Sequence, residues 1–307
     1  MTISLDAGPA KPRRRPQNRK WNGWKGYLFI APTMLLVSLF FLWPLISTFW
    51  MSLHSWPLIG EHKWVGLGNY QRLITDTRFY SALRFTAFYT VVISIVIFVA
   101  SFGLAFFVEK KRPMVGAYRT AFFLPVVIGL GASSLLWVWL ANVDSGLFGP
   151  LMVKLGLVEK APNLLAKFNS AFLLIIVMVA WKTVGFTMVL LLTGLQAIPT
   201  EIIEAARIDG ANAWQRFTRI ILPLMRRTLA LSLILSITGS ILGFDQFYVM
   251  TNGGPQNRMV GVVHYIFNQS FVSFKLGYGS ALSLVLLVIL LLLSLLQLWL
   301  LRTPEDR

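Results

Sequence analysis

The stretch TEIIEAARIDGANAWQRFTRIILP, residues 200–223, is the only long polar and charged segment of this chain that lies between two apolar runs. Its pattern predicts two short helices joined by a turn. Pro199 and Thr200 suit the N′ and N-cap positions of the first helix. Asp209-Gly210 supplies the turn, in which Gly210 can adopt a positive φ. The segment is therefore expected to fold as a helix-turn-helix outside the membrane.

The second of the two helices has its own boundary signals. Asn212, with Gln215 three residues later, is a capping pair that opens it, and Pro223 is expected to end it before the next apolar run. In the first helix, Ile202, Ile203 and Ala206 form one apolar side at helical spacing.

The composition indicates a membrane protein, since 56% of the 307 residues are hydrophobic, 13% are charged and the mean hydropathy is +0.67. We predict an all-α integral membrane protein with six transmembrane helices in one domain, residues 27–301. Residues 1–26, rich in Pro and Arg, are predicted to be a disordered basic tail, and residues 302–307 a second short tail. The predicted spans are about 27–50, 83–108, 119–141, 170–194, 228–249 and 278–301.

The net charge of +16 would suggest a nucleic-acid partner in a soluble protein, but the placement of the charges argues otherwise. Eighteen of the 28 Lys and Arg residues fall in the two tails, in the connector after the second predicted span and around residues 200–223, against nine in the opposite connectors. By the positive-inside rule both termini and the 200–223 segment are cytoplasmic. We therefore expect contact with membrane lipid and none with nucleic acid.

The polar segment also resembles a known motif. Its spacing resembles the EAA motif of permease subunits of ATP-binding-cassette (ABC) importers. The matching residues are Glu204-Ala205-Ala206, then Gly210 after three residues, Ile220 after nine more, and Leu222-Pro223 after one more. The competing interpretation is an arbitrary amphipathic connector. GLQAIP (194–199), DGA (209–211), GLGNY (66–70) and YVMTNGGP (248–255) are similar to the carbohydrate branch, the maltose-type and glycerol-phosphate-type permeases.

This resemblance implies a function for the segment and a set of partners. In the family the helix is the coupling helix (coupling region 199–223 here), which docks into a cytoplasmic ATPase. The partners implied are a second homologous permease subunit, two ABC ATPase subunits and an extracytoplasmic solute-binding protein, in a bacterial or archaeal inner membrane. The substrate implied is a sugar, oligosaccharide or related polyol, moved by alternating access. The coupling residues implied are Glu201, Glu204, Ala205, Ala206, Asp209, Gly210 and Ala211.

Signatures of catalysis are missing from the sequence. It contains no GxxxxGK[ST] loop for a nucleotide and no GxSxG elbow for a serine nucleophile. His54, His62 and His264 are scattered, without HExxH or a carboxylate cluster that would make a metal site. We therefore expect no enzyme activity, no catalytic residue, no metal and no cofactor in this chain, with ATP bound by partner subunits.

Two ionisable residues fall inside predicted spans, Lys182 in the fourth and Asp245 in the fifth. A charge in hydrocarbon costs about 2.5–3.5 kcal/mol, so both should face protein or a watery cavity. Structural roles are equally open: Gly239 and Gly243 as a helix contact, Lys182 with Asp245 as an ion pair, or Lys182 holding a carbonyl. The resemblance favours a substrate path, for which the candidates are Val179, Lys182, Thr183, Phe186, Gly239, Ser240, Gly243, Asp245 and Gln246.

Other functions remain open at this point. Within the importer class, Lys182 would suit glycerol 3-phosphate or a glycerophosphodiester. An ion-coupled secondary transporter would also carry intramembrane charges, but it usually has more spans and two related halves. A membrane-embedded enzyme would need a cluster of His or acidic residues at one depth.

Overall fold

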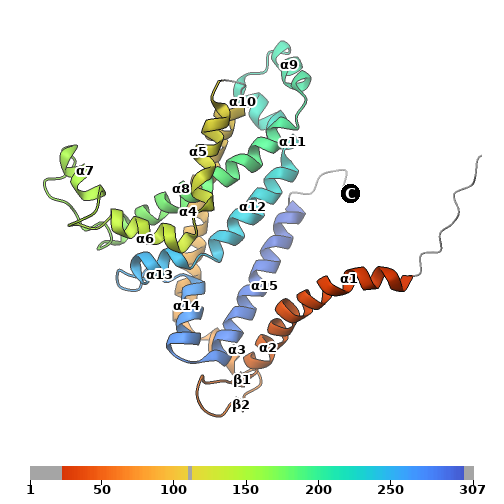
Figure 1. The fold of residues 1–307 in the computed structure, drawn as a ribbon, viewed down its shortest axis with the longest axis vertical. Coiled ribbons are helices and arrows are strands. Elements are labelled where there is room, and N and C mark those ends of the chain that lie inside the picture. Colours follow the sequence, from red (N-terminus) through yellow and green to blue (C-terminus); the bar gives the residue numbers. More distant parts are fainter. Residues whose placement is uncertain (1–22, 110–112, 301–307) are drawn as a thin grey trace, which may run out of the picture. The chain divides into compact units, whose positions relative to one another are not determined.

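A computed structural model of the chain describes residues 23–109 and 113–300, and within them the secondary structure is almost entirely helical (Figure 1). The predicted tail residues 1–22 and 302–307 lie outside this description. In this described part of the chain, five helices are long and apolar enough to cross a membrane, and a sixth span is present if one bent helix pair counts as a span. The prediction of a mostly helical protein with several candidate membrane spans is confirmed, and the count of six stays a prediction. The five are Tyr27–Ser52, Thr77–Glu109, Phe168–Gln196, Arg226–Thr251 and Leu276–Leu300.

The chain divides into two compact units, residues 1–47 and residues 48–307. The first contains α1 (Gly23–Val37), the π-helical turn η1 (Ser38–Leu42) and the start of α2 (Trp43–Ser52). The turn η1 ends two residues before Pro44, and such a bulge accommodates the loss of the backbone hydrogen bond that a proline cannot donate. From Tyr27 to Ile46 every side chain is exposed, as expected of a helix that lies in lipid or against another subunit.

The second unit is organised around α4 (Thr77–Glu109) and α8 (Phe168–Gln196), which pack along each other. Their shared core contains the fully buried Tyr89, Ile93, Ile175 and Met178. Around this pair lie α5 (Val115–Val127), α6 (Leu130–Leu140), α12 (Arg226–Ile241), α13 (Asp245–Thr251), α14 (Val262–Phe267), the π-helical turn η3 (Asn268–Val272) and α15 (Leu276–Leu300).

The third and fifth predicted spans are both interrupted, contrary to the expectation of continuous helices. The α5 and α6 axes meet at 96°, because Ile128 is extended at ψ 130° and Gly129 takes the N-cap position of α6. Pro125, three residues before the break, cannot donate a backbone hydrogen bond and favours the end of α5 here. In the fifth span, residues 242–244 separate α12 from α13.

Short elements also occur in the connectors that the sequence analysis treated as loops. β1 (His54–Ser55) and β2 (Lys63–Trp64) form an antiparallel hairpin, followed by α3 (Gly68–Ile74), and α7 (Phe148–Lys154) lies in the 142–169 loop. Asn69, from the GLGNY segment, donates hydrogen bonds to the carbonyl oxygens of Ser52 (2.7 Å) and His54 (2.9 Å). One amide therefore fixes the chain between α2 and the hairpin.

Asp76 joins three elements at the end of α4 that is remote from Glu109. Its Oδ1 accepts hydrogen bonds from the backbone amides of Arg78 (3.0 Å) and Phe79 (3.1 Å). Its Oδ2 accepts them from the hydroxyls of Tyr265 in α14 (2.6 Å) and Tyr278 in α15. Burial alone would raise the pKa of Asp76, but these four hydrogen bonds outweigh burial and lower it below the ordinary value.

Candidate functional site: a cavity at the broken spans and a helix pair beyond them

A small cavity of about 170 Å³ lies where α4, α6, α8, α12 and α13 meet. Hydroxyl and amide groups share its wall with apolar side chains, a mixture that suits a ligand carrying both hydroxyls and C–H faces. The lining residues are Tyr89, Ile97, Leu130, Val179, Lys182, Thr183, Phe186, Thr187, Leu190, Ser232, Leu235, Ser236, Gly239, Ser240 and Gln246.

Of the nine candidate path residues, the cavity brings seven together. They are Val179, Lys182, Thr183, Phe186, Gly239, Ser240 and Gln246.

The other two candidates, Gly243 and Asp245, do not line the cavity. A Cβ at Gly243 would overlap the side-chain amide of Gln246, so this glycine makes room for a neighbour. The break at residues 242–244 separates α12 from α13 and changes the direction in which the residues of α13 point. A role of Gly243 and Asp245 in the substrate path stays a prediction.

Lys182 is anchored at the break between α5 and α6. Its ammonium group donates hydrogen bonds to the carbonyl oxygens of Val126, at 3.2 Å, and of Ile128. These carbonyls end α5 and have no helical partner of their own. Asp245, in the first turn of α13, lies beside Gly131 in the first turn of α6, where a Cβ would be 4.0 Å from the carboxylate. The two charges thus face opposite helix ends, each matching the local dipole.

Tyr89 is a cavity residue that the sequence analysis missed. It is fully buried, and its hydroxyl accepts a hydrogen bond from Nε2 of Gln246 at 3.3 Å. Within the described part of the chain, Oε1 of Gln246 and Oγ of Ser236 are buried without a hydrogen-bond partner. Such acceptors and hydroxyls are available to a ligand. Tyr89 lies in an apolar run of the sequence that gives no sign of an inward face. The phenolic hydroxyl of Tyr89 was the one available signal that this residue contacts a cavity.

The polar segment forms the predicted helix pair. The first helix is α9 (Thr200–Ile208), and the second runs through α10 (Ala213–Arg216), the π-helical turn η2 (Phe217–Ile221) and α11 (Leu222–Leu224). The predicted capping box is present: the backbone amide of Gln215 donates to Oδ1 of Asn212, and the backbone amide of Asn212 donates to Oε1 of Gln215, each at 2.8 Å. Gly210 has φ +78°, as expected for its turn.

Two boundary predictions for this pair are wrong. Pro199 is the N-cap of α9, with no side-chain cap, and Thr200 is already helical. Pro223 does not end the second helix, which continues to Leu224, because a proline at the first turn of a new helical segment loses no bond.

The side chains of α9 differ in exposure between the two sides of the helix. Ala206 is buried and Ile203 half-buried, whereas Ile202 is 41% exposed, so the expected apolar side is only partly covered. Ala211 is half-buried. The remaining predicted coupling residues are exposed: Glu201, Glu204, Ala205, Asp209 and Gly210.

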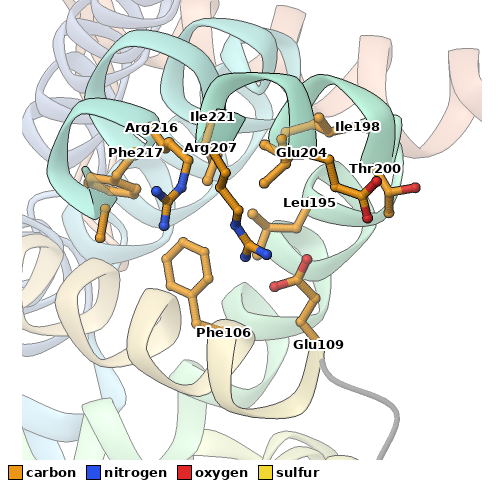
Figure 2. Close-up of a pocket in the computed structure, with 12 residues that line it drawn as sticks. Phe106, Glu109, Leu195, Ile198, Thr200, Glu204, Arg207, Arg216, Phe217 and Ile221 are labelled. Carbon is orange, nitrogen blue, oxygen red and sulfur yellow. The ribbon is translucent and has the colours of Figure 1, made fainter. Parts of the chain in front are cut away.

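Beneath α9 lies a cleft of about 610 Å³ between this helix pair and the ends of α4 and α8 (Figure 2). Glu109 at the end of α4, together with Glu204, Arg207 and Arg216, gives the cleft two charges of each sign. Figure 2 shows the side chains of Arg207 and Glu109 pointing toward each other across it. Charged side chains of α9 and of the end of α4 thus face the same cleft.

The histidines do not converge in the described residues. His54 and His62 contact each other in the hairpin region, with ring centroids 6.1 Å apart, while His264 is buried against Phe244 and Tyr248. Burial lowers the pKa of His264, which favours the neutral ring. Over residues 23–109 and 113–300, no three His, Asp or Glu side chains are grouped as metal ligands would be.

Comparison with known proteins places this architecture in a family. Residues 115–304 match the family "Binding-protein-dependent transport system inner membrane component". The chain is 32% identical over 283 residues to the probable ABC transporter permease protein YurN of Bacillus subtilis, covering 91% of this chain and 97% of that one. It is 30% identical to the probable starch degradation products transport system permease protein AmyD of Thermoanaerobacterium thermosulfurigenes, covering 92% and 96%.

Among solved structures, the fold is similar to a chain of a bacterial ABC transporter involved in the import of the acidic polysaccharide alginate. The TM-score is 0.78 at 21% identity, covering 91% of this chain and 95% of that chain. The family match, the relatives and the fold agree over most of the chain. This protein therefore belongs to the inner membrane components of binding-protein-dependent transport systems, the permease subunits of ABC importers.

Proposed function

We propose that this permease forms part of the translocation path for a sugar, oligosaccharide or related polyol, moved by alternating access. The observation that carries the proposal is the cavity at the broken spans. Its hydroxyls and amides (Thr183, Ser240, Gln246) offer hydrogen bonds to sugar hydroxyls, and Phe186 offers a ring for the C–H face. A volume of about 170 Å³ fits a closed or partly closed path rather than an open one.

The geometry of Lys182 bears on the choice of substrate. A phosphate or phosphodiester would need a cation that is free to bind it. The Lys182 ammonium already donates to the carbonyls of Val126 and Ile128, so the runner-up substrates, glycerol 3-phosphate and a glycerophosphodiester, would have to compete with these bonds. An uncharged sugar would leave them in place, and we therefore favour it.

Energy would enter through α9 in this proposal. The exposed Glu201 and Glu204 are available to basic groups of an ATPase, Ala205 permits close approach, and Gly210 provides the bend. Closure of an ATPase dimer would move α9 as a rigid body together with the ends of α4 and α8 that border its cleft. The partners would be a second homologous permease, two ATPase subunits that bind ATP, and an extracytoplasmic solute-binding protein.

The orientation is inferred from the charge distribution. With eighteen Lys and Arg on the side of the tails and α9, both termini and α9 would be cytoplasmic, in a bacterial or archaeal inner membrane. Residues 27–301 would act as one transmembrane domain whose coupling region is 199–223.

The test is reconstitution. The cognate binding protein is screened against a sugar panel by thermal shift, and uptake of the stabilising sugar is then measured in proteoliposomes that contain the permease pair and ATPase. We expect uptake that requires ATP, the binding protein and an intact α9. Uptake driven by an ion gradient without ATP would instead identify a secondary transporter. Location of Glu204 on the outer side, by accessibility labelling of a Glu204→Cys variant, would overturn the coupling role.

A further inference from the structure

A second and larger pocket lies at the end of α4 remote from α9. It has a volume of about 880 Å³, within the range usual for ligand sites. We call it the α14 pocket. Its walls come from the start of α4, the end of α13, the following loop, α14 and η3. The lining residues are Thr77, Arg78, Ser81, Ala82, Phe85, Tyr248, Asn252, Asn257, Arg258, Val260, Tyr265, Asn268, Gln269, Val272 and Ser273.

The side chains that line this pocket are mainly polar. Four carboxamides, two guanidinium groups and three aliphatic hydroxyls share the wall with aromatic rings, and none of the lining residues is acidic. Carboxamides both donate and accept hydrogen bonds, as sugar hydroxyls do, and the rings of Phe85 and Tyr248 can pack against C–H faces. Two arginines without a lining carboxylate also leave room for an acidic sugar.

Backbone geometry explains only part of this set. Asn252 (φ +47°) and Asn257 (φ +57°) are in the left-handed region, where asparagine is among the residues best tolerated, so a turn alone would account for them. No such reason applies to Asn268 and Gln269 in η3, whose backbone is helical. Within the described residues, Oε1 of Gln269 is buried and accepts no hydrogen bond. An unpartnered buried acceptor beside a polar pocket indicates a missing ligand or water.

The α14 pocket and the cavity at the broken spans lie one after the other along the same two helices, α4 and α13. On α4, Phe85 lines the pocket and Tyr89, one turn further, lines the cavity, about 6 Å along the axis. On α13, Tyr248 lines the pocket and Gln246 the cavity. Buried Phe247 lies between them, with its ring centroid 5.1 Å from that of Phe85 and 4.8 Å from that of Tyr89. Three aromatic rings thus separate the two spaces.

From this arrangement we propose that the α14 pocket is a second carbohydrate-binding site, a staging site from which the sugar passes Phe247 into the cavity. The inference rests on the proposed transport function and adds a site to it. In the proposed orientation this pocket faces the outside, where substrate arrives. Its greater volume lets it hold a saccharide in the present conformation, while the cavity of about 170 Å³ is too small for an oligosaccharide.

The direct test is saturation-transfer NMR on the complete importer in nanodiscs without binding protein, with maltotriose as the neutral probe and trigalacturonate as the acidic probe. We expect transfer to at least one probe in the wild type. Ser273→Trp, or Ser81→Trp on the opposite wall, should fill the pocket and lower this transfer about tenfold. Both serines are exposed, so the larger side chain leaves the core intact. Ser55→Trp, at an exposed serine of the hairpin, is the matched control and should not change the signal.

A variant in the other space locates the signal. Gly239→Leu places a side chain in the cavity, where a Cβ meets no atom within 4 Å, and should leave transfer to the probe unchanged. Loss of transfer in this variant, or its persistence in both tryptophan variants, would overturn the staging site. A tryptophan variant that loses uptake but keeps transfer would show that the pocket docks the binding protein, which also overturns it.

Failure of this inference and failure of the transport function can be told apart. If the reconstituted importer takes up a sugar with ATP and binding protein, yet neither probe receives saturation in the wild type, then the staging site is refuted and the function stands. If no sugar is taken up under any condition, the function itself is refuted.

Discussion

The ammonium group of Lys182 lies 3.2 Å from the carbonyl oxygen of Val126, and this contact connects the middle of α8 to the end of α5. Ile128 supplies a second acceptor on the same side of the break. Asp245 occupies the other side, next to the first turn of α6. Because α8 runs on to the residues before α9, the proposed mechanism would transmit a displacement of α9 to the 96° break through Lys182.

The first prediction concerns this link. Lys182→Met keeps the length and apolar body of the side chain but leaves two carbonyls without their donor, at a cost of about 1–3 kcal/mol. We expect the permease to assemble with its partners and uptake to fall about tenfold, since the break is no longer held to α8. Initial uptake rates in proteoliposomes, with assembly followed by size-exclusion chromatography, measure both.

Lys167→Met is the matched control, because Lys167 is exposed just before α8 and its side chain makes no cap hydrogen bond to that helix. This variant should transport normally. Unchanged uptake kinetics in Lys182→Met would show that the lysine contributes no more than structure.

The second prediction concerns the close approach of α8 to α5 one turn beyond Lys182. A Cβ at Gly185 would overlap the carbonyl group of Phe122, a backbone atom that cannot move aside. Gly185→Ala should therefore separate the two helices and destabilise the permease by about 1–3 kcal/mol. Thermal unfolding in nanodiscs followed by tryptophan fluorescence checks this.

Gly103→Ala provides the control on a neighbouring helix. Gly103 lies within α4, is exposed and has nothing within 4 Å of an added Cβ. The alanine should stabilise α4 slightly, by about 0.5–1 kcal/mol, because it restricts the unfolded backbone. Equal unfolding midpoints for the two alanine variants would refute the packing argument.

Local signals in the sequence predicted local structure well. The capping box of Asn212 with Gln215 and the positive φ of Gly210 depend on residues a few positions apart, so spacing and residue type were sufficient. Seven of the nine candidate path residues line one cavity, Lys182 among them, whereas Asp245, the other ionisable residue within a predicted span, does not. Their role in transport stays a prediction.

Features that depend on contacts between distant segments were not predictable in this way. The break at Ile128 is stabilised by Lys182, which is 54 residues away, and the sequence around Gly129 alone is compatible with a continuous span. Tyr89 reaches the cavity only because α4 packs against α8 and α13. Which residues of α13 face the cavity depends on the interruption at 242–244. Gly243 lies in this interruption and does not line the cavity.

The third prediction concerns Asp76 and pH. The pKa of Asp76 is lower in the folded protein than in the unfolded chain, where it is about 3.9. Its carboxylate therefore contributes stability that is present above pH 4 and is lost as the pH falls through the lower folded pKa. Asp76→Asn should lower the free energy of unfolding by about 1–3 kcal/mol at pH 7, since Tyr265 and Tyr278 lose a charged acceptor.

The difference between wild type and Asp76→Asn should shrink when unfolding is measured at pH 3, because the wild-type carboxyl is then increasingly protonated. Asp144→Asn, at an exposed loop position, is the control and should show little difference at either pH. A constant difference between Asp76→Asn and wild type across this range would mean that the charge of Asp76 does not stabilise the fold.

The fourth prediction separates backbone conformation from side-chain bulk in the turn after α9. Gly210 has φ +78°, and an added Cβ would meet no atom of this chain within 4 Å, so within the permease a substitution acts through the backbone. Gly210→Val, a β-branched residue that is strained at positive φ, should cost about 1–2 kcal/mol and redirect the chain between α9 and α10. We expect normal membrane insertion but loss of ATP-dependent uptake.

Gly210→Asn can adopt the left-handed conformation and should retain most of the uptake. Uptake assayed beside ATPase activity in the same proteoliposomes shows whether hydrolysis continues without transport. If valine and asparagine proved equally active, the left-handed turn at Gly210 would have no part in coupling.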